Sequence, residues 1–192
     1  MVGAAARLIR AIAGVGAAVL AAGTGAAPAP AWVVDVACRE GHPQGRYELR
    51  DGDGQLRVAG AFNDGRRAGS FIFWSGAGVR LAHIPFDDDA RNGTLALWHD
   101  GPAGREPVRW LESVWHHGVR DGQTRSWFGD GHPRAESEYV DGRLAGSRGW
   151  TDAGERLTDD VALERARADT AAADAYFSSL EQIVRDHLPR CD

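Results

Sequence analysis

Glycine recurs along this 192-residue chain at an almost constant spacing. The steps between the recurring glycines are 24, 24, 29 and 24 residues. The phrase DGRRAGS at 64–70 returns as DGRLAGS at 141–147, three such periods plus five residues later. A fixed period in this range predicts an array of stacked structural repeats. The repeat-defining glycines are Gly45, Gly69, Gly93, Gly122 and Gly146.

Aromatic residues keep the same frame. Trp74, Trp98 and Trp127 each follow a repeat-defining glycine by five residues, and Trp150 follows one by four. A second aromatic residue follows the glycine by 17 residues in three repeats, and by 22 in the long repeat, where it is Trp115. The five extra residues of the long repeat therefore lie between Trp98 and Trp115.

Each repeat has the features of a β-hairpin. Asp-Gly occurs seven times, and this pair tolerates the positive φ that tight hairpin turns demand. Segments such as 70–74, 94–98 and 136–140 are of strand length and partly aromatic or β-branched. We therefore predict a mainly β fold, an elongated antiparallel sheet of stacked β-hairpin repeats with a period of about 24 residues, with a C-terminal α-helix packed on it or capping it.

Strand parity predicts what each face of the sheet carries. In 70–74 the two phenylalanines face one way, and Ile72 and Trp74 face the other. Both faces are apolar here, so we expect both to be covered. In the fourth repeat the phenylalanine positions hold Thr124 and Ser126. We expect that end of the first face to be exposed to solvent.

The C-terminal segment has a helical pattern. Thr158 is a candidate N-cap, two aspartates follow it in the first turn, and Pro189 ends the run. Apolar residues recur at i, i+3 and i+4 spacing through the second half of this segment. We expect this helix to dock on the sheet face that carries Phe71, Phe73, Leu95 and Leu97. Its apolar residues are Ala173, Tyr176, Phe177, Leu180, Ile183, Val184 and Leu188.

The first 31 residues resemble a cleavable secretory signal peptide. Arg7 and Arg10 precede an uncharged run, 11–27, and Ala29-Pro30-Ala31 is a small-x-small cleavage site. The alternative is an uncleaved membrane anchor, and no later stretch approaches the length of a span. The chain has 22 basic residues, all of them arginine, which is typical of a GC-rich bacterial genome. Cleavage would remove two of them and change the net charge from −5 to −7, which disfavours nucleic-acid binding.

Two cysteines, Cys38 and Cys191, flank the rest of the chain. In an exported protein such a pair predicts a disulfide, since the compartment is oxidising. The alternative is two unpaired buried thiols. The bridge would close a loop of about 150 residues and connect the end of the predicted helix to the first strand.

The pattern aromatic-x-x-Gly-x-x-x-Gly resembles the MORN repeat (membrane occupation and recognition nexus), in its divergent bacterial form. It occurs at 62–69, 115–122 and 139–146, and at 86–93 with Asp89 in place of the first glycine, so that turn is expected to differ. The resemblance implies an elongated sheet of hairpins and a role in protein scaffolding or phospholipid contact. We divide the chain into a signal peptide (1–31), a lead-in strand (32–44), MORN-like repeats (45–157) and the helix with its tail (158–192).

Catalytic motifs are not apparent. The sequence has no zinc-protease His-Glu-x-x-His, no Gly-x-Ser-x-Gly and no phosphate-binding loop. His116 and His117 are adjacent on a predicted strand and would point to opposite faces, which disfavours a shared metal ion. We therefore expect neither an enzyme nor a cofactor or metal.

The long repeat is the best candidate for partner binding, because insertions in repeat proteins map to binding faces. Trp110 stands outside the offsets found above, and Trp115, His116 and His117 follow it. Core packing is the alternative for both tryptophans. We expect an exported, non-enzymatic scaffold or protein-interaction module that binds a protein partner in the bacterial envelope. The alternatives are an immunity- or antitoxin-type inhibitor of a toxin and, less favoured, an envelope hydrolase or a lipid-binding protein, since the acidic chain would repel anionic lipids.

Overall fold

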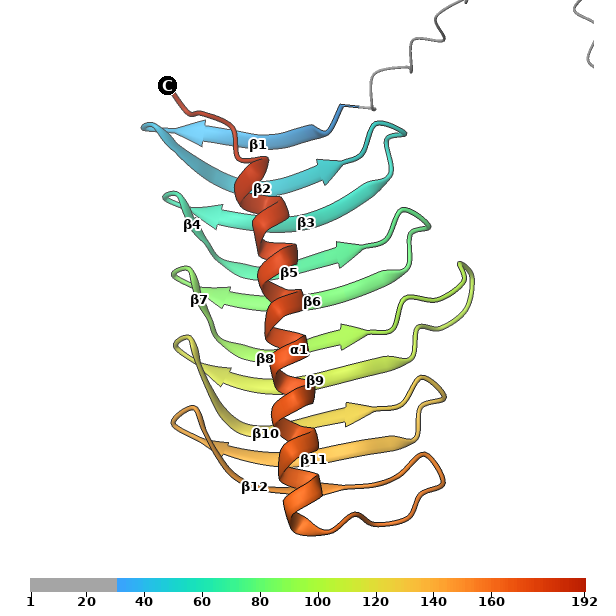
Figure 1. Ribbon diagram of the computed structural model, residues 1–192. Coiled ribbons are helices and arrows are strands. Elements are labelled where there is room, and N and C mark those ends of the chain that lie inside the picture. Colours follow the sequence, from blue (N-terminus) through green and yellow to red (C-terminus); the bar gives the residue numbers. More distant parts are fainter. Residues whose placement is uncertain (1–30) are drawn as a thin grey trace, which may run out of the picture.

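The computed structural model describes residues 31–192, so the predicted signal peptide lies almost wholly outside the described residues. The described chain forms one antiparallel sheet crossed by one long helix (Figure 1). Ten strands pair in the order β1-β2-β3-β5-β6-β8-β9-β10-β11-β12, while β4 pairs with β3 and β7 with β6. The predicted fold class is confirmed. The strands are β1 Val33–Arg39, β2 His42–Arg50, β3 Leu56–Asn63, β4 Arg66–Arg67, β5 Gly69–Trp74, β6 Arg80–Asp87, β7 Ala90–Arg91, β8 Gly93–Trp98, β9 Arg109–His116, β10 Val119–Trp127, β11 Pro133–Val140 and β12 Arg143–Gly149.

The predicted Asp-Gly turns lie at both ends of the strands: two-residue turns join the strands along one side of the sheet, and the pairs at 53–54 and 130–131 are in the loops of the other side. At 64–65, 117–118 and 141–142 a non-glycine residue and a glycine both have positive φ, as a two-residue hairpin turn requires. The turn with Asp88 and Asp89 has the same form, with φ of 50° and 66°, so the aspartate that replaces glycine does not change it. Longer loops join the strands along the opposite side of the sheet, and the predicted insertion is part of the loop 99–108 (Figure 1).

One face of the sheet packs against the helix α1, Asp159–Asp186. Phe71, Phe73, Leu95 and Leu97 are fully buried in one cluster with Phe177, as the parity argument predicts. Ala173, Leu180 and Val184 of the helix are buried in the same cluster, and Tyr176, Ile183 and Leu188 pack at its margin. The predicted docking of the helix is confirmed. Thr158 is the N-cap by position, although its side chain makes no capping hydrogen bond.

The helix is as long as the sheet is wide. Its 28 residues extend about 42 Å, and the ten strands of the main path span about 43 Å. Figure 1 shows α1 running from β12 back to β1, nearly perpendicular to the strands. Seven helical residues rise about 10.5 Å, close to the spacing of two strands, so helical positions seven apart meet equivalent positions in successive hairpins.

The covered face at the fourth repeat is polar but is not exposed to solvent, contrary to our expectation. Thr124 and Ser126 are only 4% and 3% exposed, because the first half of α1 covers them. Ser126 donates to Asp169 of the helix at 2.7 Å, and Ser113 and Thr124 share a hydrogen bond of 2.7 Å. Hydrogen bonding therefore replaces apolar packing at this end and satisfies the buried groups.

A disulfide joins Cys38 in β1 to Cys191 beyond the helix, as predicted. Cys38 lies 24 residues before Phe62, so it stands at the position that aromatic residues hold in the other repeats. The covalent bond thus replaces an aromatic contact at the terminal repeat. It also ties the end of the helix to the edge strand, and a stable disulfide is typical of an oxidising, extracytoplasmic compartment. Within residues 31–192, no helix combines the length and apolar character that a membrane crossing requires.

Candidate functional site: the open face of the sheet

The second apolar face is not covered, which corrects our expectation. In residues 31–192 no strand or helix packs on the side opposite α1, so this open face is available to a partner (Figure 1). The strand register defines one row of side chains across it, each directly opposite the next in the neighbouring strand. This open row consists of Asp35, Glu48, Ala59, Ile72, His83, Ala96, Glu112, Arg125, Glu136 and Arg148.

Beside the open row, tryptophans alternate with arginines. Trp74 pairs with Arg80 across β5 and β6, and Trp98 pairs with Arg109 across β8 and β9. The guanidinium carbons of Arg80 and Arg109 lie 5.2 and 5.5 Å from the centre of the Trp98 ring, within the range of cation–π attraction. Arg109 also lies 6.0 Å from the ring centre of Trp127. Trp98 is therefore only 9% exposed on a face that no element covers, because arginines shield it.

A depression of about 350 Å³ lies in the middle of this face, around Trp98. Ile72, Ala96 and Trp98 provide apolar lining, and Arg80, Arg109 and Glu112 provide charge. A second depression of about 260 Å³ adjoins it, shares Arg80 and Trp98, and is walled by the loop 99–108. We call the two together the central groove. The inserted residues thus form one wall of it.

His83 lies in the same groove beside Arg80. Its Nε2 is 2.8 Å from the hydroxyl of Ser70. Burial of the ring lowers the pKa of His83 below its ordinary value, and the positive charge of Arg80 lowers it further. The imidazole is therefore held neutral at pH 7, and the positive charge of the groove comes from arginine.

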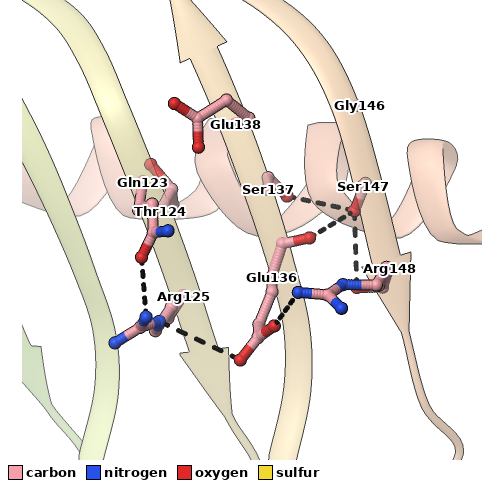
Figure 2. A pocket seen from close by; sticks show the side chains of 9 residues that line it. All are labelled: Gln123, Thr124, Arg125, Glu136, Ser137, Glu138, Gly146, Ser147 and Arg148. Atoms are coloured by element: carbon pink, nitrogen blue, oxygen red, sulfur yellow. Dashed lines mark hydrogen bonds and ion pairs between the residues drawn. The ribbon is translucent and has the colours of Figure 1, made fainter.

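A polar depression of about 260 Å³ lies farther along the face, over β10, β11 and β12 (Figure 2). The two arginines of this depression already interact with neighbouring side chains. Arg148 donates to Glu136 at 2.9 Å, while Arg125 lies 3.9 Å from the same carboxylate and donates to Gln123 at 2.6 Å. The charges here largely neutralise one another, in contrast to the central groove.

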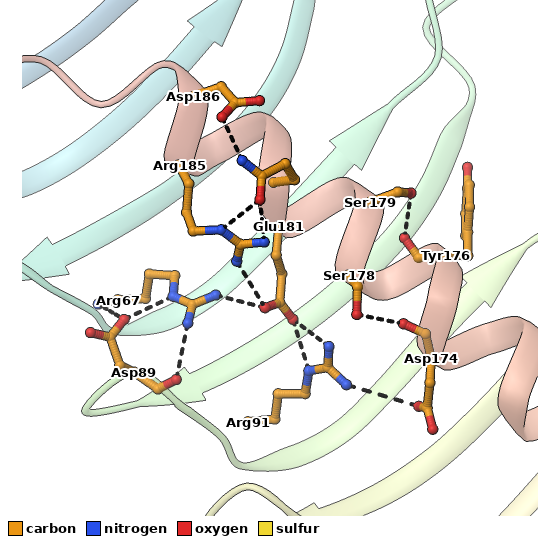
Figure 3. A network of polar contacts seen from close by, with 11 residues as sticks. Arg67, Asp89, Arg91, Asp174, Tyr176, Ser178, Ser179, Glu181, Arg185 and Asp186 are labelled. Carbon is orange, nitrogen blue, oxygen red and sulfur yellow. Dashed lines mark hydrogen bonds and ion pairs between the residues drawn. The ribbon is translucent and has the colours of Figure 1, made fainter.

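A second cluster of arginines belongs to the covered face and holds the helix (Figure 3). The carboxylate of Glu181 accepts from Arg67 at 3.1 Å and from Arg91 at 2.7 Å. Arg120 donates to Asp174 at 2.7 Å. Arg67, Arg91 and Arg120 stand at one position of the repeat, two residues after the second turn residue, and Asp174 and Glu181 are seven apart on the helix. The spacing of these arginines in the repeats therefore matches the spacing of the acidic residues on the helix, and the ion pairs hold the helix on the sheet.

The four predicted partner-binding residues do not meet at one surface. Trp115 is 8% exposed and lies between Arg91 and Arg120 on the covered side, with ring-to-guanidinium distances of 5.0 and 4.7 Å. His116 and His117 are exposed at a turn, where His116 lies 3.2 Å from Asp121. Binding by any of them stays a prediction.

The spacing of Trp110 first indicated a position outside the repeat frame, but the structure places it within that frame. It is the extra residue of a β-bulge, since Leu97 pairs with Leu111 and Trp98 with Arg109. Leu81 and Arg134 are the extra residues of the corresponding bulges in β6 and β11. The bulge turns Trp110 toward the helix, where its ring centre lies 5.8 Å from that of Tyr176.

Sequence reasoning missed Arg80 and Arg109, although a signal exists. Arg80 lies 11 residues after its repeat-defining glycine, and Arg109 lies 16 after its own, which is 11 plus the five inserted residues. The residues at this position in the first and fourth repeats are Leu56 and Pro133. Only the two hairpins around Trp98 therefore carry a cation there. Within the described residues, no three potential metal ligands gather in one place.

Comparison with known proteins does not add a family to this picture. No family model, curated protein or solved structure matches the chain. The likeness to MORN repeats thus rests on the residues quoted above and on the antiparallel sheet of hairpins that they form.

Proposed function

We propose that this chain is an exported, non-enzymatic protein-interaction module of MORN-like construction, which binds a protein partner in the bacterial envelope through the open face of its sheet. The observation that carries the proposal is the contrast between the two faces. The helix and the arginines of Figure 3 cover one face, while the other presents half-buried aromatic residues and a groove to solvent. A concave surface that combines aromatic residues with arginine is typical of interaction sites.

The disulfide supports the location. Cys38 and Cys191 are far apart in sequence and joined in the fold, a linkage that persists in oxidising compartments. The sheet supports the role, because its side chains are held on a rigid, hydrogen-bonded frame. A preorganised surface loses less entropy on binding than a mobile one does.

The proposal is tested by capture from native envelope extract with two variants. Ile72→Asp places a charge at the centre of the open face, whereas Val161→Asp changes an exposed residue on the helix, 41% accessible, and serves as the matched control. We expect a protein that wild type and Val161→Asp both capture and that Ile72→Asp loses, with the circular dichroism of all three unchanged. Equal capture by both variants would overturn the proposal.

An inhibitor of a toxin is a second form of the same function, in which the open face blocks a toxin's site. It predicts that the captured partner is an enzyme whose activity falls when this protein is added in stoichiometric amount. A scaffold leaves that activity unchanged.

One observation bears on the hydrolase alternative. The hydrogen bond between Ser70 and His83 has the geometry of a nucleophile and its base. Within residues 31–192, however, His83 forms no ion pair with a carboxylate that would orient its ring. Hydrolysis of generic esters, peptides or glycans by wild type but not by Ser70→Ala would support that alternative over ours.

A further inference from the structure

We propose that the central groove recognises a carboxylate on an acidic segment of a protein partner, with Arg80 as the principal contact and Arg109 as the second. This inference deepens the proposed function and rests on it, because it names the chemistry that the open face selects. It follows from the unequal use of arginine across the face.

Of the two arginines that line the central depression, Arg80 is the one without an ion pair among the described residues. Arg46 and Arg50 are paired with Glu48, and Arg125 and Arg148 are paired with Glu136. Within residues 31–192, Arg80 makes no ion pair, and its described contact is with the ring of Trp98. Cation–π attraction to the indole favours this position of the guanidinium and does not use its N–H groups as an ion pair would. A carboxylate is the group that this fork fits, through two parallel hydrogen bonds.

Arg109 adds to the positive charge of the groove. It is paired with Glu112, so the three charged side chains of the first depression sum to one positive charge. The second depression adds Arg105 and Glu106, whose charges cancel, so the central groove as a whole also carries one positive charge. The lowered pKa of His83, to which Arg80 contributes after burial, is a second sign of this local field. The chain as a whole has a net charge of −5, so the groove is a positive site on an acidic protein. An acidic partner would therefore be directed to this site in preference to the rest of the surface.

The lining indicates what should accompany the carboxylate. Ile72, Ala96 and Trp98 form an apolar surface beside the arginines. A volume of about 350 Å³ admits a few side chains and not a folded domain. The ligand is therefore an aspartate or glutamate with an apolar neighbour, presented by a loop or an extended segment.

An anionic membrane fits this face less well. A lipid surface would contact the whole sheet, including Glu48, Glu112, Glu136 and Glu138, which share the open face with the arginines. Glu48, Glu112 and Glu136 already pair with most of the neighbouring arginines, so a flat array of lipid phosphates would find few free guanidinium groups there. A single side chain entering the central groove meets Arg80 and avoids most of those carboxylates.

The test uses three fluorescein-labelled peptides of equal length, with repeating Glu-Leu, Gln-Leu and Lys-Leu, and the disulfide-bonded protein of residues 32–192. We expect the Glu-Leu peptide to bind in fluorescence anisotropy, with an affinity that falls as salt rises, and the other two to bind at least tenfold more weakly. Arg80→Gln should weaken Glu-Leu binding about tenfold, the loss of one charge-assisted contact. Arg148→Gln, on the same face but paired with Glu136, is the control and should leave binding unchanged.

Glu112→Gln provides a variant with the opposite sign. It removes the carboxylate that competes for Arg109, so Glu-Leu binding should become a few times stronger. A protein damaged by mutation would not bind more tightly, which separates this result from a loss of folding.

Three outcomes would overturn the inference. In the first, the protein binds the Glu-Leu and Gln-Leu peptides equally, or binds neither peptide. In the second, Arg80→Gln binds the Glu-Leu peptide as strongly as wild type does. In the third, the protein binds phosphatidylglycerol vesicles but not the Glu-Leu peptide. The proposed function is judged separately. If Ile72→Asp loses the envelope partner while Arg80→Gln retains it, the open face is the binding surface and acid recognition is wrong. If Ile72→Asp retains it, both are wrong.

Discussion

Arg91 in β7 donates to Glu181 in the helix, with its Nη2 2.7 Å from the carboxylate Oε1. The same carboxylate accepts from Arg67, and all three side chains are less than one-fifth exposed. Glu181→Gln removes the charge that two partly buried guanidinium groups share, so it should lower the free energy of unfolding by about 3 kcal/mol. Urea denaturation followed by tryptophan fluorescence measures this change.

Glu136 supplies the control for that prediction. It also lies between two arginines, but it and its partners are on the open face and one-third or more exposed. Glu136→Gln should cost less than about 1 kcal/mol, because water screens the pair. Equal losses for the two variants would show that burial under the helix does not strengthen the Glu181 interaction.

Phe177 is fully buried between the helix and the sheet. Phe177→Ala should lower the free energy of unfolding by about 3–5 kcal/mol, since it removes an aromatic ring and leaves a cavity. Phe177→Asp places a charge in the same position and should prevent docking of the helix. The exposed apolar surface would then bind the dye 8-anilinonaphthalene-1-sulfonate, and unchanged melting of either variant would contradict the observed packing.

The disulfide closes a loop of 153 residues. Replacing both cysteines by serine should lower the free energy of unfolding by about 4–5 kcal/mol, chiefly because the unfolded chain gains freedom. Amide hydrogen exchange should also rise over the last helical turn, which the bond holds against β1. If amide exchange in the last turn stays at the wild-type rate, apolar packing alone fixes this end of the helix.

The pKa of His83 is lowered in the folded protein by burial and then by Arg80, from an ordinary value of 6.5. As the pH falls below 6.5, the unfolded chain binds a proton before the folded one does, so stability decreases. His83→Gln should therefore lose less stability than wild type between about pH 7 and pH 5. Arg80, Arg109 and Glu112 line the same depression and are present in both proteins, so the difference between the two curves reports His83. Parallel curves would contradict the lowered pKa.

The repeat period was sufficient to predict the sheet, the turns and the covered face, because each depends on local sequence. The glycine frame located Gly65 and Gly142 in turns, and parity placed Phe71 and Phe73 under the helix. The bulge at Trp110 was not predictable in this way, since an extra residue in a strand reverses parity without leaving a sequence signal.

Coverage depends on partners far apart in sequence, and here local reasoning was wrong twice. Ser126 was expected to be wet because serine is polar, but Asp169, 43 residues away, accepts its hydrogen bond. Trp98 was expected to need a covering element, but Arg80 and Arg109 shield it instead. In the first case a polar partner takes the place of water, and in the second two arginines take the place of an apolar covering element.

The match between the length of the helix and the width of the sheet restricts how such a chain can change over generations. Repeat proteins ordinarily gain or lose whole units by tandem duplication or deletion, because each unit contacts only its neighbours. Here a new hairpin would need about seven more helical residues at the same time, and Cys191 would otherwise no longer reach Cys38. The helix therefore sets the copy number, and duplication of one hairpin alone would be selected against.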